Sequence, residues 1–104
     1  MAQRFQLVLQ FDVKTPNDLE DLVRIEDMFR DVLGPKANVD GHDVGAGEFN
    51  IFIFTSALEE TFERAQALMS AHCPLRKFKA AYREPEAEDF VILWPLDLSV
   101  FNIA

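Results

Sequence analysis

The chain has 104 residues, a formal net charge of −8, and 49% hydrophobic and 27% charged residues. This length and composition predict one folded domain and argue against intrinsic disorder. Because binding to phosphate depends on Lys and Arg, the acidic balance makes nucleic acid a poor partner. No apolar run reaches the roughly 18 residues that a membrane span needs. The single cysteine, Cys73, fits a reducing compartment, so we expect a cytoplasmic protein without an internal disulfide.

The first two predicted elements are a strand and a helix. Residues 4–13, RFQLVLQFDV, alternate apolar and polar side chains, which indicates a half-buried strand. Thr15 and Pro16 follow as a helix start, with Thr as the N-cap and Pro in the first helical position. Apolar residues at helical spacing continue this helix to the stop signal Gly34-Pro35.

The second half of the chain adds three strands and a helix. Two strands are expected on either side of Gly45-Ala46-Gly47, and Ser56-Ala57-Leu58-Glu59 matches a capping box at the start of a helix that ends at Pro74. Residues 77–83 read as a strand, followed by the acidic turn 84–89. The apolar segment 90–94 is expected to pair with 77–83 and to be covered on both faces, Trp94 included. An apolar tail, residues 96–104, completes the chain.

The predicted order is β-α-β-β-α-β with one strand added. Two right-handed β-α-β crossovers place both helices on one face of an antiparallel sheet. We therefore expect an α+β fold, a ferredoxin-like two-layer sandwich with an extra C-terminal strand, formed as a single domain by residues 1–104. The predicted core consists of inward positions of every element, namely Leu7, Leu9, Phe11, Leu22, Phe29, Ile51, Ile53, Phe62 and Leu68.

The sheet face without helices is the predicted functional surface. A three-residue turn, Gly45 to Gly47, would place His42 opposite Asn50 and Asp40 opposite Phe52, and opposed residues share a face. Asp43 would then point toward the helices. The expected surface on the open face consists of Val8, Gln10, Asp40, His42, Asn50, Phe52 and Phe54.

Three uses of this open face compete. A second subunit or the tail could cover it, a small molecule could bind in a pocket between the sheet and its cover, or His42 could act as an acid–base group oriented by Asn50 or Asp12. A metal site needs about three or four convergent ligands, and the segment around His42 brings only two together, so neither a metal nor another cofactor is expected.

A basic cluster stands out against the acidic background. It consists of Arg76, Lys77, Lys79 and Arg83. A solvated strand edge is the first interpretation of these residues, and an anion site is the second.

Two short motifs resemble those of a group of small uncharacterised bacterial proteins. Gly45-Ala46-Gly47-Glu48-Phe49-Asn50 matches their Gly-x-Gly-Glu-x-Asn hairpin, and Ile92-Leu93-Trp94-Pro95 matches their terminal Ile-x-Trp-Pro strand. This resemblance implies no activity. At the level of the fold, the apolar open face is also similar to that of the dimeric α+β-barrel proteins, in which two open sheets face each other around a pocket.

We expect a non-catalytic binding or interaction module that forms a homodimer through the open sheet face. The tail, which contains Leu96, Leu98, Val100, Phe101 and Ile103, is expected to reach onto the partner subunit. The alternative is a small enzyme or small-molecule-binding protein with a pocket on this face and His42 as its acid–base group. Another protein remains a possible partner, whereas nucleic acid and membranes are not expected.

Overall fold

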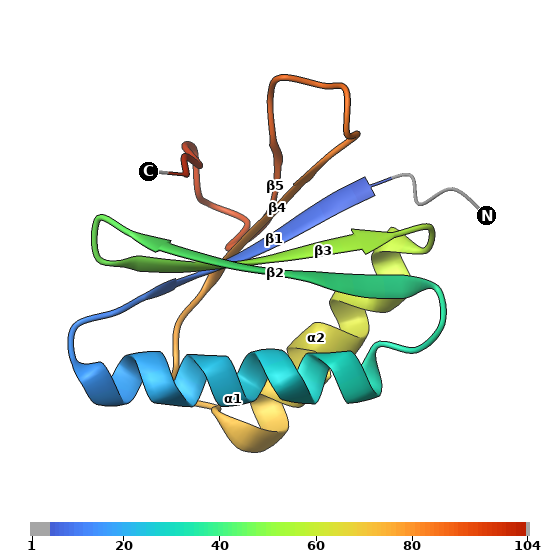
Figure 1. Ribbon diagram of the computed structural model, residues 1–104. Coiled ribbons are helices and arrows are strands. Elements are labelled where there is room, and N and C mark those ends of the chain that lie inside the picture. Colours follow the sequence, from blue (N-terminus) through green and yellow to red (C-terminus); the bar gives the residue numbers. More distant parts are fainter. Residues whose placement is uncertain (1–4, 104) are drawn as a thin grey trace.

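The computed structural model describes residues 5–103, so Arg4 and Ala104, the outer ends of the predicted first strand and tail, lie outside the described residues. Its elements are β1 (Phe5–Asp12), α1 (Pro16–Val32), β2 (Ala37–Gly45), β3 (Glu48–Thr55), α2 (Leu58–His72), β4 (Lys79–Arg83) and β5 (Val91–Trp94). The strands form one five-stranded antiparallel sheet in the order β2-β3-β1-β4-β5. Both helices cover one face of this sheet (Figure 1), which confirms the predicted ferredoxin-like sandwich. Within residues 5–103, no helix combines the length and the apolar character needed to cross a membrane.

The two helix starts differ in how well the sequence predicted them. At α1 the Thr15 hydroxyl accepts the Asp18 N–H at 3.2 Å, and the Asp18 carboxylate accepts the Thr15 N–H at 3.2 Å, which completes a capping box. At α2 the predicted capping box is absent, because the N-cap is Ala57 and no side chain caps the helix. Instead, the Thr55 hydroxyl, one position before the predicted box, accepts the Ala57 N–H at 3.0 Å.

The core lies between the sheet and the helices, and most of its predicted members are buried. Leu7, Leu9, Phe11, Leu22, Phe29, Ile51, Ile53 and Leu68 are confirmed. Phe62 is wrong as a core residue, because it is only partly buried at the edge of the cluster. Its neighbour Thr61 takes the inward position, and its hydroxyl lies 2.7 Å from that of Thr55. Thr61 was not predicted as a core residue because the core of α2 was assigned from the spacing of apolar residues, and threonine is polar.

The β2–β3 hairpin turns on two residues, Ala46 and Gly47, and not on the predicted three. Both have positive φ, 51° for Ala46 and 75° for Gly47, which is typical of the tightest hairpin turns. Gly45, predicted to lie in the turn, consequently pairs with Glu48, and the residues from Gly41 to Val44 each pair one position away from the prediction. Because side chains alternate between faces, this single step exchanges the faces of His42 and Asp43.

A bulge restores the predicted register further along β2. The pairing shifts between Val39 and Gly41, so that Asp40 is the extra residue of the bulge and opposes no residue of β3. The prediction that Asp40 faces Phe52 is therefore wrong, and Gly41 occupies that position. Beyond the bulge, Asn38 pairs with Phe54, as the predicted register requires.

The last hairpin and the tail rise on the open side of the sheet (Figure 1). β4 pairs with β5, which confirms the predicted hairpin. Trp94 is 39% exposed, so the expectation that both faces of the last strand are covered is wrong. The tail returns to the chain's own sheet, where the carbonyl of Asn102 accepts a hydrogen bond from Gln10. Its contact with a partner subunit stays a prediction.

The core assignment predicts a clear order of stability losses. Phe29→Ala should lower the free energy of unfolding by about 3–5 kcal/mol, because the ring is fully buried between α1 and the sheet. Phe62→Ala should cost less, about 1–3 kcal/mol, since water already reaches its ring. Urea denaturation of the two variants measures both values. An equal or larger loss for Phe62→Ala would contradict the described position of α2.

The capping box at α1 predicts a dependence of stability on acid. The N–H of Lys14, followed by that of Thr15 and by the Arg76 guanidinium, holds the pKa of Asp18 below its ordinary value of 3.8, although partial burial opposes this effect. A carboxylate whose pKa is lowered by folding stabilises the folded state above its unfolded pKa, and this contribution is lost as the pH falls through the folded pKa. The stability difference between the protein and Asp18→Asn should therefore shrink below about pH 4. Urea midpoints measured across this range check it, and a constant difference would contradict the cap.

Candidate functional site on the open sheet face

The open face consists of cross-strand rows whose character changes along the strands. One row joins Phe54, Gln6 and Arg83, and the next joins Phe52, Val8 and Ala81. The last row joins Asn50, Gln10 and Lys79. We call the first two rows the aromatic half and the third row the polar end. The pairing confirms that Val8, Gln10, Asn50, Phe52 and Phe54 share one face.

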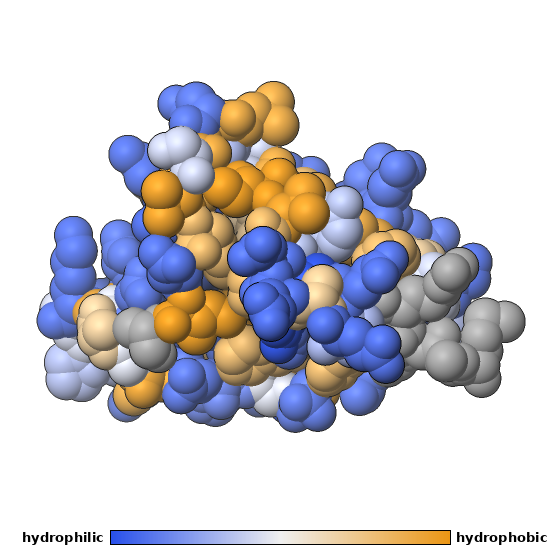
Figure 2. Space-filling view, turned by 90° about the horizontal axis from the view of Figure 1, so that it is seen from above, coloured by the Kyte–Doolittle hydropathy of each residue, from blue (hydrophilic) through white to orange (hydrophobic). Residues whose placement is uncertain are grey.

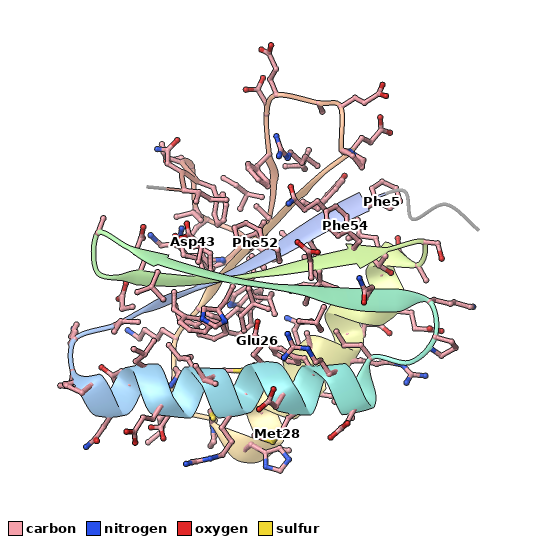
Figure 3. The ribbon with its side chains drawn as sticks, viewed as in Figure 1. Phe5, Glu26, Met28, Asp43, Phe52 and Phe54 are labelled. Carbon is pink, nitrogen blue, oxygen red and sulfur yellow. The ribbon has the colours of Figure 1, made fainter. Side chains whose placement is uncertain are left out.

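The two phenylalanines of the aromatic half are only partly buried. Figure 3 shows Phe52 and Phe54 on the side of the sheet away from the helices, whereas Glu26 lies between the sheet and α1. Gly41 opposes Phe52 and contributes no side chain, and a Cβ built on it would meet nothing within 4 Å. The β2 side of Phe52 is therefore open.

The polar end ties the tail to the sheet through one amide group. Gln10 is 3% exposed, and its Nε2 donates to Asn50 Oδ1 at 2.9 Å and to the backbone carbonyl of Asn102 at 2.9 Å. Both hydrogens of the amide are thereby used. Because Asn50 is also buried, this arrangement satisfies polar groups that would otherwise be costly to remove from water.

Arg83 joins the sheet to the last hairpin. Its Nε donates to Gln6 Oε1 at 2.8 Å and its Nη1 to the carbonyl of Ala87 at 3.1 Å. The guanidinium also lies 5.1 Å from the centre of the Phe90 ring, and that ring packs against Phe101 of the tail at 5.3 Å. These contacts form a wall of the aromatic half that is built from three separate segments of the chain.

The tail covers part of the face and adds new apolar surface of its own. Val8 is fully buried and Gln10 nearly so, but Leu96 and Val100 are 87% and 62% exposed. Seen from the open side, apolar side chains gather around the middle of the molecule (Figure 2). The open side therefore still exposes apolar side chains, because those of the tail itself, Leu96 and Val100, face the solvent.

His42 lies on the other side of the sheet, which corrects its predicted place on the open face. It pairs with Ile51, and its Nδ1 lies 2.8 Å from Oε1 of Glu26 on α1. Its ring stacks on Phe49 with 4.6 Å between the ring centres. The weak catalytic candidates are thus separated, because Asn50 and Asp12 face away from His42. Asp43, which was predicted to point toward the helices, occupies the position opposite Asn50 that was predicted for His42.

Glu26 is the residue of this pair that the sequence analysis missed. It is 3% exposed, its Oε1 meets His42, and its Oε2 makes no hydrogen bond to any residue within 5–103. Arg30 Nη2 lies 3.6 Å from that oxygen. Its position in the sequence could have revealed it. Glu26 comes four residues after Leu22 and three before Phe29, and this spacing places its carboxylate among the inward-facing residues of α1.

No protein-family model, curated protein or solved structure matches the chain. Among residues 5–103, no group of three or more His, Cys, Asp or Glu side chains could hold a metal ion. The function is therefore inferred from the geometry of the site itself.

The observed register predicts opposite outcomes for two neighbouring residues of β2. His42→Ala should lower the free energy of unfolding by about 1–3 kcal/mol, because it removes the hydrogen-bond partner of the buried Glu26 carboxylate. Asp43→Ala is the matched control and should stay within about 0.5 kcal/mol, since Asp43 is exposed on the opposite face. Urea denaturation measures both variants. A larger loss for Asp43→Ala would contradict the two-residue turn.

The double variant Glu26→Leu/His42→Ala tests the origin of that loss. Glu26 is buried whereas the His42 side chain is 35% exposed, so loss of His42 mainly leaves the Glu26 carboxyl group without its partner, and replacing that group by an apolar side chain removes the unpaired polar group as well. The double variant should therefore be more stable than His42→Ala. If it is less stable, packing of the imidazole on Phe49 accounts for the loss and the Glu26 carboxylate does not.

Proposed function

We propose that this protein is a non-catalytic interaction module of the cytoplasm that forms a homodimer through the aromatic half of its open sheet face. One observation carries the proposal: Phe52 and Phe54 remain partly exposed beside a tail that turns Leu96 and Val100 outward. A cytoplasmic location is supported by the single cysteine, which has no partner for an internal disulfide.

The amount of apolar surface favours a second copy of the chain as the occupant. Soluble monomers seldom expose a contiguous apolar patch larger than a few hundred Å². A two-fold dimer is the commonest way to bury such a patch, because each subunit presents the same surface to the other. The floor formed by Phe52 and Phe54 would then pack against its copy, with the tails at the rim.

The position of His42 favours this binding role over the enzymatic alternative. Its imidazole lies on the helix side of the sheet and is bonded to Glu26, so it does not reach a ligand on the open face. The buried polar side chains at the polar end are amides, and Gln10 and Asn50 are bonded to each other. Amide groups position ligands and partners but do not act as acids or bases near neutral pH.

The dimer predicts a concentration-dependent sedimentation behaviour that depends on the open face. The intact protein should sediment as a dimer at micromolar concentration, and Phe52→Ser/Phe54→Ser should sediment as a monomer, because the substitutions remove the apolar floor. The matched control is Leu75→Ser, which changes a side chain that is 94% exposed in the loop after α2. It should leave the dimer intact.

Circular dichroism of each variant keeps the result interpretable, since a folded monomer is the expected outcome for the double variant. A monomeric intact protein at micromolar concentration would overturn the proposal. So would a dimer that survives Phe52→Ser/Phe54→Ser, because self-association would then use another surface.

A further inference from the structure

A small cleft lies at the polar end of the open face, where the sheet meets the start of the tail. It has a volume of about 210 Å³ and is lined by Gln10, Asp12, Lys77, Phe78, Lys79 and Pro95. Clefts that bind drug-sized molecules usually measure about 300–1,000 Å³. A cleft of this size therefore suits a ligand smaller than a drug molecule, on the order of ten non-hydrogen atoms or fewer.

The cleft is lined by the two residues of the basic cluster, Lys77 and Lys79, whose side chains make neither an ion pair nor a hydrogen bond within residues 5–103. Arg76 lies 3.4 Å from Asp18 and 3.6 Å from Asp21, and Arg83 is bonded to Gln6 and Ala87. By contrast, no carboxylate of residues 5–103 lies within 4.0 Å of the ammonium group of Lys77 or Lys79. Both lysines line the cleft, where Asp12 is the single acidic neighbour. The lining thus carries one net positive charge in a strongly acidic chain.

The floor and the walls of the cleft are held in place by the fold. Lys79 pairs directly with Gln10 across β4 and β1, so the two side chains share the open face. Gln10 is fixed by its two hydrogen bonds to Asn50 and Asn102, and only its carbonyl oxygen is left to accept a further bond. Phe78 packs against Phe11 of the core at 5.9 Å between the ring centres, which gives the cleft an apolar wall.

We propose that this cleft binds a small organic carboxylate. The two lysines attract the anionic group, and Phe78 and Pro95 contact a short apolar body. The apolar wall favours an organic carboxylate over inorganic phosphate, because phosphate has no apolar body to bury against Phe78 and Pro95. This inference does not rest on the homodimer, since the aromatic half and the cleft occupy different rows of the face.

Benzoate is a suitable probe because it combines one carboxylate with a compact apolar ring. Its titration into the isotopically labelled intact protein, followed by amide chemical shifts at low ionic strength, should give saturable changes centred on Gln10 and residues 77–79. Benzamide, a neutral molecule of nearly the same shape, should bind at least about fivefold more weakly, because it lacks the charge that the lysines attract. Inorganic phosphate should also bind more weakly than benzoate.

Substitutions of lysines inside and outside the cleft show whether benzoate binds in the cleft itself or is attracted to any exposed lysine. Lys77→Gln/Lys79→Gln should weaken benzoate binding at least about fivefold. Lys36→Gln, which removes an exposed charge before β2, should leave it unchanged. Equal binding of benzoate and benzamide, stronger binding of phosphate, or unchanged binding to the double lysine variant would each overturn the proposal.

The homodimer and the cleft can fail separately in these experiments. Phe52→Ser/Phe54→Ser should still bind benzoate with the affinity of the intact protein, because neither residue lines the cleft. Loss of benzoate binding in that folded variant would contradict a site confined to the polar end, whereas the sedimentation of the intact protein tests the homodimer alone.

Discussion

The turn between β2 and β3 determines which side chains each face of the sheet presents. Ala46 adopts a positive φ of 51° that L-residues seldom occupy, and Gly47 completes the turn at 75°. This tight connection directs His42 toward α1, where it meets the Glu26 carboxylate. The bulge at Asp40 shifts the pairing by one residue, so that Val39 pairs with Ile53 and its side chain is buried in the core. The pairing of Glu26 with His42 and the open character of the aromatic half both depend on these two irregularities.

Gln10 connects the two parts of the open face. One amide group holds Asn50 on the neighbouring strand and the backbone of the tail, and the same residue forms the floor of the cleft. On one side the aromatic half is bounded by Arg83 and Phe101, each of which packs against Phe90 at the edge of the last hairpin. The open face is therefore partly assembled by segments that are far apart in the chain, and the proposed dimer contact and the proposed anion cleft occupy opposite ends of it.

The layers and the strand pairing could be predicted because alternation and helical spacing report directly on burial. The period of two in β1 placed Val8 and Gln10 on the open face, and Thr15 with Pro16 marked the start of α1. The face of His42 could not be predicted in this way. Two- and three-residue turns differ by one residue of register, and a glycine-rich segment permits both. Glu26 and Thr61 were missed for a related reason, because polar residues in an inward stripe are recognised only when their bonding partners are known.

One attachment of the tail to the sheet uses its backbone, since the acceptor for Gln10 is the carbonyl of Asn102 and the side chain of Asn102 is exposed. Any amino acid supplies such a carbonyl, whereas the second attachment, Phe101 against Phe90, depends on an aromatic side chain. Neither attachment involves Leu96 or Val100, so substitutions at these two exposed positions should leave the course of the tail unchanged. The surface that the open side presents can therefore be altered by substitution without rebuilding the sheet beneath it.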